Sequence, residues 1–399
     1  MALQTSGAIT LDQIHIEAGG TTGSSATLND DDIRGLIGVS SGSTMSFNAW
    51  YGASNAPVFS TVKWSGDGSA STLVTGVDMT GDAMMVTHNE GNHKTSWWDT
   101  TRGITHPIGT NFVNGQSTDT VSIDSFNSDG FTTLAKATSG YTAVNGYPSR
   151  TRDQWAFSWG VGASFFDMVH FDAPGDGQAY DIAHNLGVAP EMMYIQQYSN
   201  TDNADPILYH KSMNSTPEDY FLSIYRTIGI SGPNSEYWNS TAPTSTHFSL
   251  GSNIHTNPTT AENNGAKYSA YLFASIAGFC DIGSYVGNGT SNGTKTIDCG
   301  FTNGAAFVWI RTISSLTQSQ SGWFLCPVED GNSLDDVRGD IIRTESTTQA
   351  YTQSNSPPNP IAHAATGFVV NVTGHFRANR ITQLNQNGIT YMYYAIARQ

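Results

Sequence analysis

The feature that most constrains the fold is an internal repeat. Three stretches run from a strand-like segment into a turn in which an acid or an amide lies between two glycines. The central residues of these turns are Asp67, Asp176 and Asn288, and they follow one another at nearly equal intervals. Glycine adopts positive φ without steric cost and Asn or Asp tolerates it, so each triplet predicts a β-turn between strands. A chain with such a period is expected to form one structural unit per repeat.

Each repeat closes with a strand in which rings or aliphatic residues recur at every second position. These strands cover residues 154–159, 268–273 and 391–396, and Phe157, Tyr271 and Tyr394 occupy matching positions in them. Period two is the signature of a β-strand, so we expect these three rings to lie in the repeat cores. Asn-Gly steps precede the second and third of these strands at 264–265 and 387–388. Because such steps favour tight turns, each repeat is predicted to end in a hairpin.

Composition favours the same fold class. Charged residues make up only 13% of the chain, aromatic residues 11%, and there are 41 glycines, a balance typical of strands and turns. The chain is also too long for one ordinary core. We therefore predict a mostly β protein with three tandem antiparallel β-sandwich domains of jelly-roll type, at 56–165, 166–278 and 279–399. Each sandwich is expected to have its own core.

The first 55 residues carry helix signals instead. Thr10, Asn29 and Ser46 each precede a short helical pattern, and acidic residues follow the first two. A segment of this size is too short to bury a convincing core, so we predict that it docks onto a partner surface. The residues expected to make this contact are Ile14, Ile33, Leu36, Phe47, Trp50 and Tyr51.

Charge and segment patterns argue against two classes of partner. The formal net charge is −16, which disfavours binding to a phosphate backbone. No apolar run is long enough to span a bilayer, and the start lacks a signal-peptide pattern, so we expect no membrane insertion. The cysteines, Cys280, Cys299 and Cys326, have no CxxC spacing and are expected to be buried free thiols.

Two parts of the chain resemble known families. The runs 6–14, 28–37 and 45–52 resemble a small module that opens many tailed-phage virion proteins, especially those of marine phages that infect cyanobacteria. The repeats resemble a phage β-sandwich domain of unknown function, best between Phe59 and Trp159. The second copy lacks the Ser-Asp-Gly-Phe turn of this pattern, and the third has Ile396 where a Trp is expected. The resemblance implies a virion location and no established catalytic residues.

No pattern in the sequence points to an active site, so we predict no enzyme activity, no cofactor and no metal. The acid clusters at 30–32, 202–205 and 330–336 lie in turn-rich settings. Oxygen-rich loops such as 330–333 leave calcium open as an alternative, although none has EF-hand spacing. His88, His93 and His106 form the densest histidine group and lack the spacing of a metal site. Aromatic residues in turn-rich loops could stack on sugars or pack in the core, namely Tyr141, Tyr147, Tyr220, Tyr237 and Trp238.

The resemblance implies a virion structural protein that is assembled in the host cytoplasm and exposed on the particle surface. The leading hypothesis is a tail-associated fibre or receptor-binding component for host attachment. Its N-terminal module would dock to other virion proteins, and its sandwiches would extend outward like beads. A homotrimer is expected by analogy with fibres, and the receptor would be a host surface glycan or protein. The alternatives are a capsid or neck decoration protein and a polysaccharide depolymerase.

Overall fold

The structure is a computed structural model of the chain, and it describes most of the β-rich part and several stretches of the N-terminal module. The residues that it describes are 3, 7–18, 21–30, 33–34, 36, 42, 44–50, 58–66, 71–77, 79, 81–89, 94–109, 118, 120, 122–127, 129–135, 144, 152–199, 206–223, 229–253, 255–257, 265–289, 295–313, 324–327, 342–343, 361–370 and 384–398.

Within these ranges the β-strands form three five-stranded antiparallel sheets. Across the first sheet the order is β1 (Val58–Gly66), β8 (Arg152–Gly160), β3 (Ala83–Asn89), β4 (Lys94–Asp99) and β5 (Ile108–Gly109). Across the second it is β9 (Phe166–Asp172), β15 (Lys267–Phe273), β11 (Met192–Gln197), β12 (Ile207–His210) and β13 (Leu222–Ser223). Across the third it is β16 (Cys280–Val286), β23 (Thr390–Ala397), β18 (Ala305–Thr312), β19 (Phe324–Pro327) and β20 (Ile342–Arg343).

A smaller sheet accompanies each of the three. The first comprises β2 (Leu73–Thr75), β7 (Gly130–Thr133) and β6 (Ile123–Asn127), and the second β10 (Tyr180–Ala183) and β14 (His247–Leu250). The third comprises β17 (Lys295–Asp298), β22 (Gly367–Val370) and β21 (Ile361–Ala364). The second set also has two short helices, η2 (Pro217–Asp219) and α3 (Ser235–Trp238). We call the three sets the first, second and third sandwich, and residues 58–398 the body.

The strand order is the same in all three sandwiches. In each large sheet the first strand pairs with the last, the last with the third, and the third with the fourth. In each small sheet the second strand pairs with the strand before the last. The prediction of a mostly β, antiparallel sandwich fold is therefore confirmed, while the boundaries given for the three domains stay a prediction.

The predicted closing hairpins are wrong. Strands β14 and β15 are consecutive but belong to different sheets, because β14 pairs with β10 and β15 pairs with β9 and β11. Strands β22 and β23 are separated in the same way. Gly265 and Gly388 do have positive φ, as turn residues should. The local conformation was thus predicted correctly, but the chain crosses between sheets at these turns because the last strand fills the gap between the first and the third.

Each sandwich has an apolar core between its two sheets, and the same ring contact recurs in all three. A ring on the first strand packs against a phenylalanine on the strand before the last, in Trp64–Phe131, Phe171–Phe248 and Tyr285–Phe368. The centroids of these pairs lie 5.5, 6.3 and 6.4 Å apart. Offset and edge-on ring contacts at this distance stabilise a sandwich interior.

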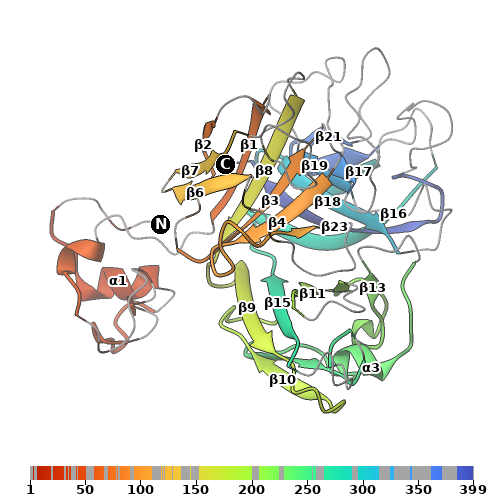
Figure 1. Ribbon diagram of the computed structural model, residues 1–399, viewed down its shortest axis with the longest axis horizontal. Helices are drawn as coiled ribbons and strands as arrows, with labels where there is room; N and C mark the ends of the chain where they lie inside the picture. The colour runs from red at the N-terminus through yellow and green to blue at the C-terminus, as the bar shows by residue number, and fades with distance from the viewer. Residues whose placement is uncertain are drawn as a thin grey trace.

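A further core, which we call the central core, is built by all three sandwiches together. It contains residues from every large sheet, among them Phe157, Tyr271 and Tyr394. Figure 1 shows the three large sheets grouped side by side, with the second sandwich below the other two. The expectation that the sandwiches extend outward like beads is therefore wrong, because their large sheets turn apolar faces toward one another and bury them.

The described part of the N-terminal module includes an α-helix and a single-turn helix, and Ile33 and Arg34 are helical as well. Helix α1 (Leu11–Glu17) begins after Thr10, whose hydroxyl accepts a hydrogen bond from the Gln13 backbone while the Gln13 side chain accepts one from Thr10, a capping box. The predicted cap at Thr10 is thus confirmed. The segment after Ser46 forms a 3₁₀ helix, η1 (Phe47–Trp50). The Asn29 side chain accepts a hydrogen bond from the Gly42 backbone, and its role as a helix cap stays a prediction.

The module has a small core of its own. Leu3, Ile9, Ile14, Ile33 and Trp50 are buried together, and the Trp50 indole donates to the Ile33 carbonyl at 3.2 Å. The expectation that this segment cannot bury a core is therefore wrong, since a fully enclosed tryptophan supplies a large apolar area. Figure 1 shows the module beside the body, to its left in this view.

Candidate functional site

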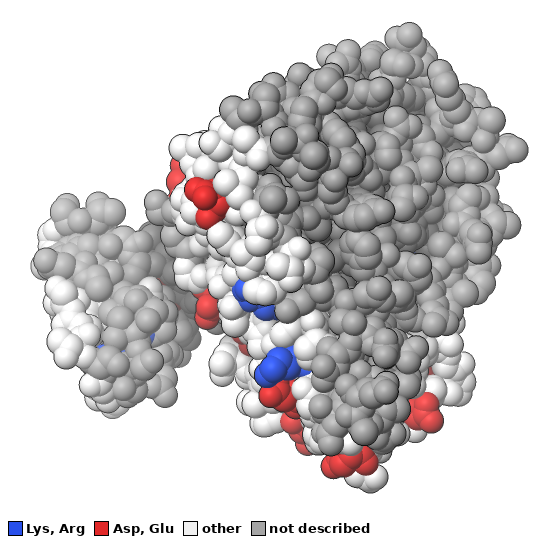
Figure 2. All heavy atoms as spheres, viewed as in Figure 1, with Lys and Arg blue, Asp and Glu red and all other residues white. Residues whose placement is uncertain are grey.

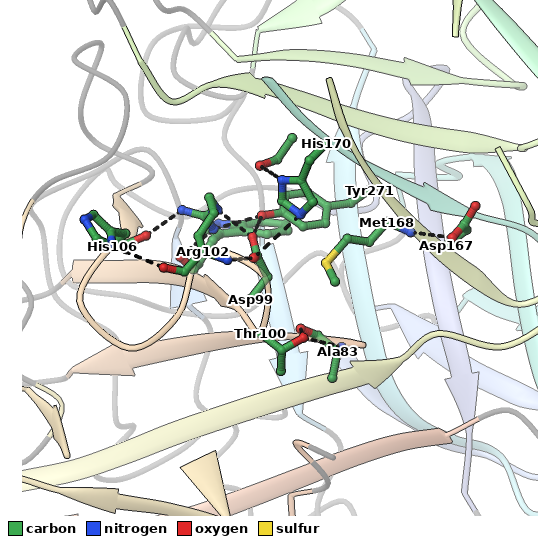
Figure 3. Close-up of polar contacts among 11 residues, drawn as sticks. Ala83, Asp99, Thr100, Arg102, His106, Asp167, Met168, His170 and Tyr271 are labelled. Carbon is green, nitrogen blue, oxygen red and sulfur yellow. Dashed lines mark hydrogen bonds and ion pairs between the residues drawn. The ribbon is translucent and has the colours of Figure 1, made fainter. Parts of the chain in front are cut away.

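A group of charged and polar side chains is buried where the first sandwich meets the second. We call Asp99, Arg102, His170 and Tyr271 the Asp99 cluster (Figure 3). Asp99 is the last residue of β4, and its side chain is 0% exposed. Arg102 lies in the turn that follows and is 3% exposed. His170 is on β9 and Tyr271 on β15 of the second sandwich.

Asp99 and Arg102 form a compact ion pair. The Arg102 Nε donates to Asp99 Oδ2 at 2.5 Å, and the Arg102 backbone N–H donates to Asp99 Oδ1 at 2.7 Å. Burial acts to raise the pKa of Asp99, but Arg102, His170 and the hydrogen bonds outweigh it, so this pKa is lowered. Asp99 is therefore ionised at neutral pH although it is buried.

Tyr271 connects this pair to the second sandwich. Its hydroxyl donates to Asp99 Oδ2 at 2.8 Å and accepts from Arg102 Nη2 at 3.0 Å. Arg102 Nη1 donates to the His106 carbonyl at 2.5 Å, and the guanidinium lies 5.9 Å from the ring centre of Tyr198. The charged hydrogen bonds thus hold two sandwiches in a defined position.

His170 and Ser269 complete the set of side chains around Asp99. The Nδ1 of His170 lies 3.1 Å from Ser269 Oγ, and its Nε2 lies 3.7 Å from Asp99 Oδ1. Burial lowers the pKa of His170 despite the nearby carboxylate. His170 is therefore neutral at neutral pH, and its contact with Asp99 is not an ion pair.

The combination of serine, histidine and aspartate resembles the parts of a hydrolytic triad, but the arrangement does not suit that chemistry. Ser269 is fully buried in the middle of β15, so a substrate has no approach to its hydroxyl. Asp99 is already engaged by Arg102 and Tyr271. A nucleophile must be reachable and its base must be oriented toward it. The Asp99 cluster is accordingly suited to joining sandwiches.

A second polar contact joins the second sandwich to the third. His210 is fully buried, its Nδ1 accepts from the Ser212 backbone at 3.1 Å, and its Nε2 lies 3.2 Å from the Tyr393 carbonyl. These partners require a neutral ring with the proton on Nε2. Burial lowers the pKa of His210 to about 4, consistent with this state. Nearby, Arg311 Nη1 donates to the Ser223 carbonyl at 2.7 Å.

The predicted turn residues lie at exposed positions, each held by a buried asparagine. Asn257 donates to the Asp176 carboxylate at 2.9 Å and accepts from the Gly175 backbone. Asn385 donates to Asn288 Oδ1 at 2.7 Å and accepts from the Asn288 backbone. The two turns are therefore fastened in the same way. Asp67 lies outside the described residues.

The predicted core residues Phe157, Tyr271 and Tyr394 are all fully buried and meet in the central core. They lie on β8, β15 and β23, the last strand of each sandwich. The sequence predicted that the three rings lie in three separate repeat cores, whereas the structure shows them together in the central core. No sequence signal linked Asp99 to Tyr271.

The predicted docking residues divide into two groups. Ile14, Ile33 and Trp50 are fully buried inside the module, so they form its core and cannot also contact a partner. Leu36 is half-buried against that core, and Phe47 is 42% exposed. Tyr51 lies outside the described residues. The expectation of a docking contact at Ile14, Ile33 and Trp50 is therefore wrong, because the segment needs these side chains for its own interior.

Among the residues that the structure describes, the remaining candidates form no cluster of metal ligands. Cys280 is buried and free as expected, while Cys299 is free but only partly buried. His106 contacts Thr105 and the Arg102 carbonyl. Tyr237 and Trp238 are buried, so they pack in the core. The loop at 330–333, His93, Tyr141 and Tyr147 lie outside the described residues, as do the side chains of His88 and Cys326.

Charged side chains are unevenly placed on the face of the molecule seen in Figure 2. Figure 2 shows Asp and Glu side chains along the edges of this face and basic side chains in small patches near its centre. In the part of the chain that the structure describes, no helix has the length and apolar character needed to cross a membrane.

Comparison with family models identifies the family of this chain. A search of curated proteins found no match. One family model, described as a domain of unknown function (DUF7483), matches residues 54–399, a range that contains all three sandwiches. The chain therefore belongs to this family of unknown function, and its N-terminal module lies before the matched region.

Proposed function

We propose that this chain is a non-catalytic structural component of a tailed-phage virion. In this proposal it is a tail-associated fibre or receptor-binding protein that attaches through its N-terminal module. The body would be presented outward as one compact unit.

The observation that carries the proposal is the division of the chain into two parts with separate cores. The module buries Ile14, Ile33 and Trp50 among its own residues, and the body begins its sheets at Val58. The family match starts at residue 54, so it excludes nearly all of the module. A small folded domain that precedes a larger domain is the arrangement expected when the small domain attaches the protein to an assembly.

The attachment surface is better assigned to exposed apolar side chains of the module. Ile16 is 44% exposed on α1, and Phe47 is 42% exposed on η1. Phe47 also packs edge-on against Trp50, with ring centres 5.4 Å apart, so its position is fixed by the module core. Exposed rings and aliphatic side chains held in place are typical anchors of protein interfaces.

The interior polar groups support binding over catalysis. Asp99, Arg102 and His210 all make contacts between sandwiches, and Ser269 is buried. Groups that hold the body together are not available to a substrate. A depolymerase remains the alternative from another class, and incubation with host envelope glycans tests it. Release of reducing ends would support the enzyme and contradict our proposal.

Incorporation into particles tests the docking role. We predict that Ile16→Ser together with Phe47→Ser abolishes incorporation while the body stays folded, because the two side chains lie outside both cores. The measurement is the amount of the protein in purified particles, with circular dichroism of the free protein as the check on folding.

A matched control is Leu73→Ser, which changes an exposed aliphatic residue of the body that is 62% exposed. It should leave incorporation unchanged. Normal incorporation of the double variant would contradict the proposed anchor. Labelling of the protein in intact particles separates the locations, since a label on the capsid face or the neck would favour a decoration protein over a tail component.

A further inference from the structure

We infer that the body is a cyclic trimer in a single chain, in which each sandwich occupies the place of one subunit. The chain would then need no second copy to complete its body. The inference concerns the assembly of the protein and does not depend on the virion role. The stoichiometry that follows from it, one chain for each attachment point, does rest on the proposed function.

The first support is the equivalence of strand positions around the central core. Pairing partners align Met84, Met192 and Phe307 on the third strands, and each is opposite a core residue of the last strand. One step along the strands, Val86, Tyr194 and Trp309 are opposite Phe157, Tyr271 and Tyr394. The last-strand partners of the first layer are Trp159, Phe273 and Ile396, and all twelve side chains of the two layers belong to the central core.

The second support is that two successive interfaces start from the same fourth-strand position and run in the same direction. Asp99 is opposite Met84 and His210 is opposite Met192, so they are equivalent residues of the fourth strands. Asp99 contacts the hydroxyl of Tyr271 on the last strand of the next sandwich. His210 contacts the backbone carbonyl of Tyr393 on the last strand of the one after, one residue before the equivalent of Tyr271. A head-to-tail contact repeated in one direction is the rule of a cyclic assembly.

The third interface closes the ring between the third sandwich and the first. The ring of Phe307 on β18 lies 5.3 Å from that of Phe59, 5.0 Å from Phe157 and 5.6 Å from Trp159. The rings of Trp97 and Trp309 are 5.5 Å apart. Because the first and third sandwiches touch directly, the arrangement is closed and does not continue as a row.

The two connectors between sandwiches have the same structure. In each connector, two residues four positions apart exchange both of their backbone hydrogen bonds. The pairs are Gly162 with Phe166 and Ile276 with Cys280. The backbone then has positive φ at Ser164 and at Gly278. Positive φ at these equivalent places, in a serine in one connector and a glycine in the other, shows that both connectors make one type of turn.

These connectors also contact one another. The rings of Phe165 and Phe279 lie 5.1 Å apart in an edge-on arrangement. Ala274 donates to the Phe165 carbonyl and Ala397 to the Phe279 carbonyl, so the last strands of the second and third sandwiches each end against the connector that precedes that sandwich. The connectors therefore lie at one end of the central core and join subunit-like units at matching points.

Cutting the connectors in the folded protein tests the inference. A protease recognition sequence is inserted after Ala163 in one connector and after Ala277 in the other, both of which are exposed. The full chain is purified uncut, cleaved, and measured by native mass spectrometry and size-exclusion chromatography. We expect three fragments that stay together in a 1:1:1 particle at the size of one chain. Separation of the fragments in native buffer would overturn the inference.

A second measurement avoids the insertions. Phe307→Ala removes the ring that closes the third interface, and Phe368→Ala removes a ring from the core of the third sandwich alone. Hydrogen exchange should rise in β1 and β8 for Phe307→Ala, although these strands belong to the first sandwich. It should rise first in the third sandwich for Phe368→Ala. Faster exchange limited to the third sandwich in both variants would contradict a shared core.

Discussion

The interface between the first and second sandwiches and the interface between the second and third each bury a polar side chain, but the two side chains are satisfied differently. At equivalent positions of the fourth strand, the first sandwich has Asp99 and the second has His210. Asp99 is ionised, paired with Arg102 and bonded to the Tyr271 hydroxyl. His210 is neutral and meets a backbone carbonyl. The same site in the fold thus tolerates a charge or a neutral ring.

The difference shows what a buried polar position requires. A carboxylate there needs a cation and a hydroxyl, because an uncompensated charge in the interior is strongly unfavourable. A histidine needs only a donor and an acceptor, and Ser212 and Tyr393 supply them from the backbone. The first arrangement should depend on specific side chains, and the second on pH.

The largest effect is expected from Arg102→Met. The variant leaves Asp99 buried without its cation, and breaking a buried pair in this way costs about 3–5 kcal/mol. The free energy of unfolding, from urea denaturation at neutral pH, measures the loss. Asp99→Asn in the Arg102→Met background should recover much of it, because the amide carries no charge.

A matched control for Arg102→Met is Lys211→Met. Lys211 pairs with Glu191 at 2.8 Å, but its side chain is 37% exposed. An exposed pair contributes about 1 kcal/mol or less. Equal losses in the two variants would show that the Asp99 cluster does not hold the first interface.

A smaller effect is expected from acid at the second interface. In the unfolded chain His210 takes up a proton below its ordinary pKa, whereas burial lowers its pKa to about 4 in the folded protein. The stability from this group is thus complete above pH 6.5 and is lost as pH falls toward 4. The loss is about 3 kcal/mol, at 1.4 kcal/mol for each unit of pKa.

His210→Gln isolates this contribution, because an amide offers a donor and an acceptor and does not titrate. The pKa values of His170 and His184 are also lowered, by burial, so they add to the same pH dependence in both proteins. Urea unfolding at several pH values should give a shallower decline for His210→Gln. Parallel curves for the two proteins would refute the assignment.

The smallest effect is expected from removing the hydroxyl of one of two equivalent tyrosines, Tyr271 and Tyr394. Tyr271→Phe removes a hydroxyl that bonds to Asp99 and Arg102, and hydrogen bonds to charged groups are worth about 1.5–3 kcal/mol. Tyr394→Phe removes a hydroxyl whose neighbours are Trp159 and Cys280, so its cost should be about 1 kcal/mol or less. Thermal unfolding of both variants measures the difference, and the reverse order would show that the cluster is not what joins the sandwiches.

Local features of the chain were predictable because neighbouring residues determine them. The cap at Thr10 and the positive φ of Gly265 and Gly388 follow from local chemistry. The equivalence of Phe157, Tyr271 and Tyr394 also followed from the repeat. The hairpins failed because pairing is decided by partners far away in sequence, such as β10 for β14.

The Asp99 cluster could not be predicted for the same reason. Asp99 and Arg102 are close in sequence, but Tyr271 lies on another sandwich. A pattern of alternating rings predicts that one face of a strand is buried, but it does not predict which element covers that face. The docking residues Ile14, Ile33 and Trp50 were misassigned because an apolar residue in a short segment can serve either an interior or an interface.

The sequence by itself determined a mostly β chain, its three-fold repetition and the small helical module. Turn residues and the period of apolar residues depend only on neighbours along the chain. Only the tertiary structure decided that the sandwiches close around one core. Each large sheet has two faces, and burying the second requires a partner of matching shape. Two other copies in the same chain supply that partner, a relation between distant residues that no local pattern records.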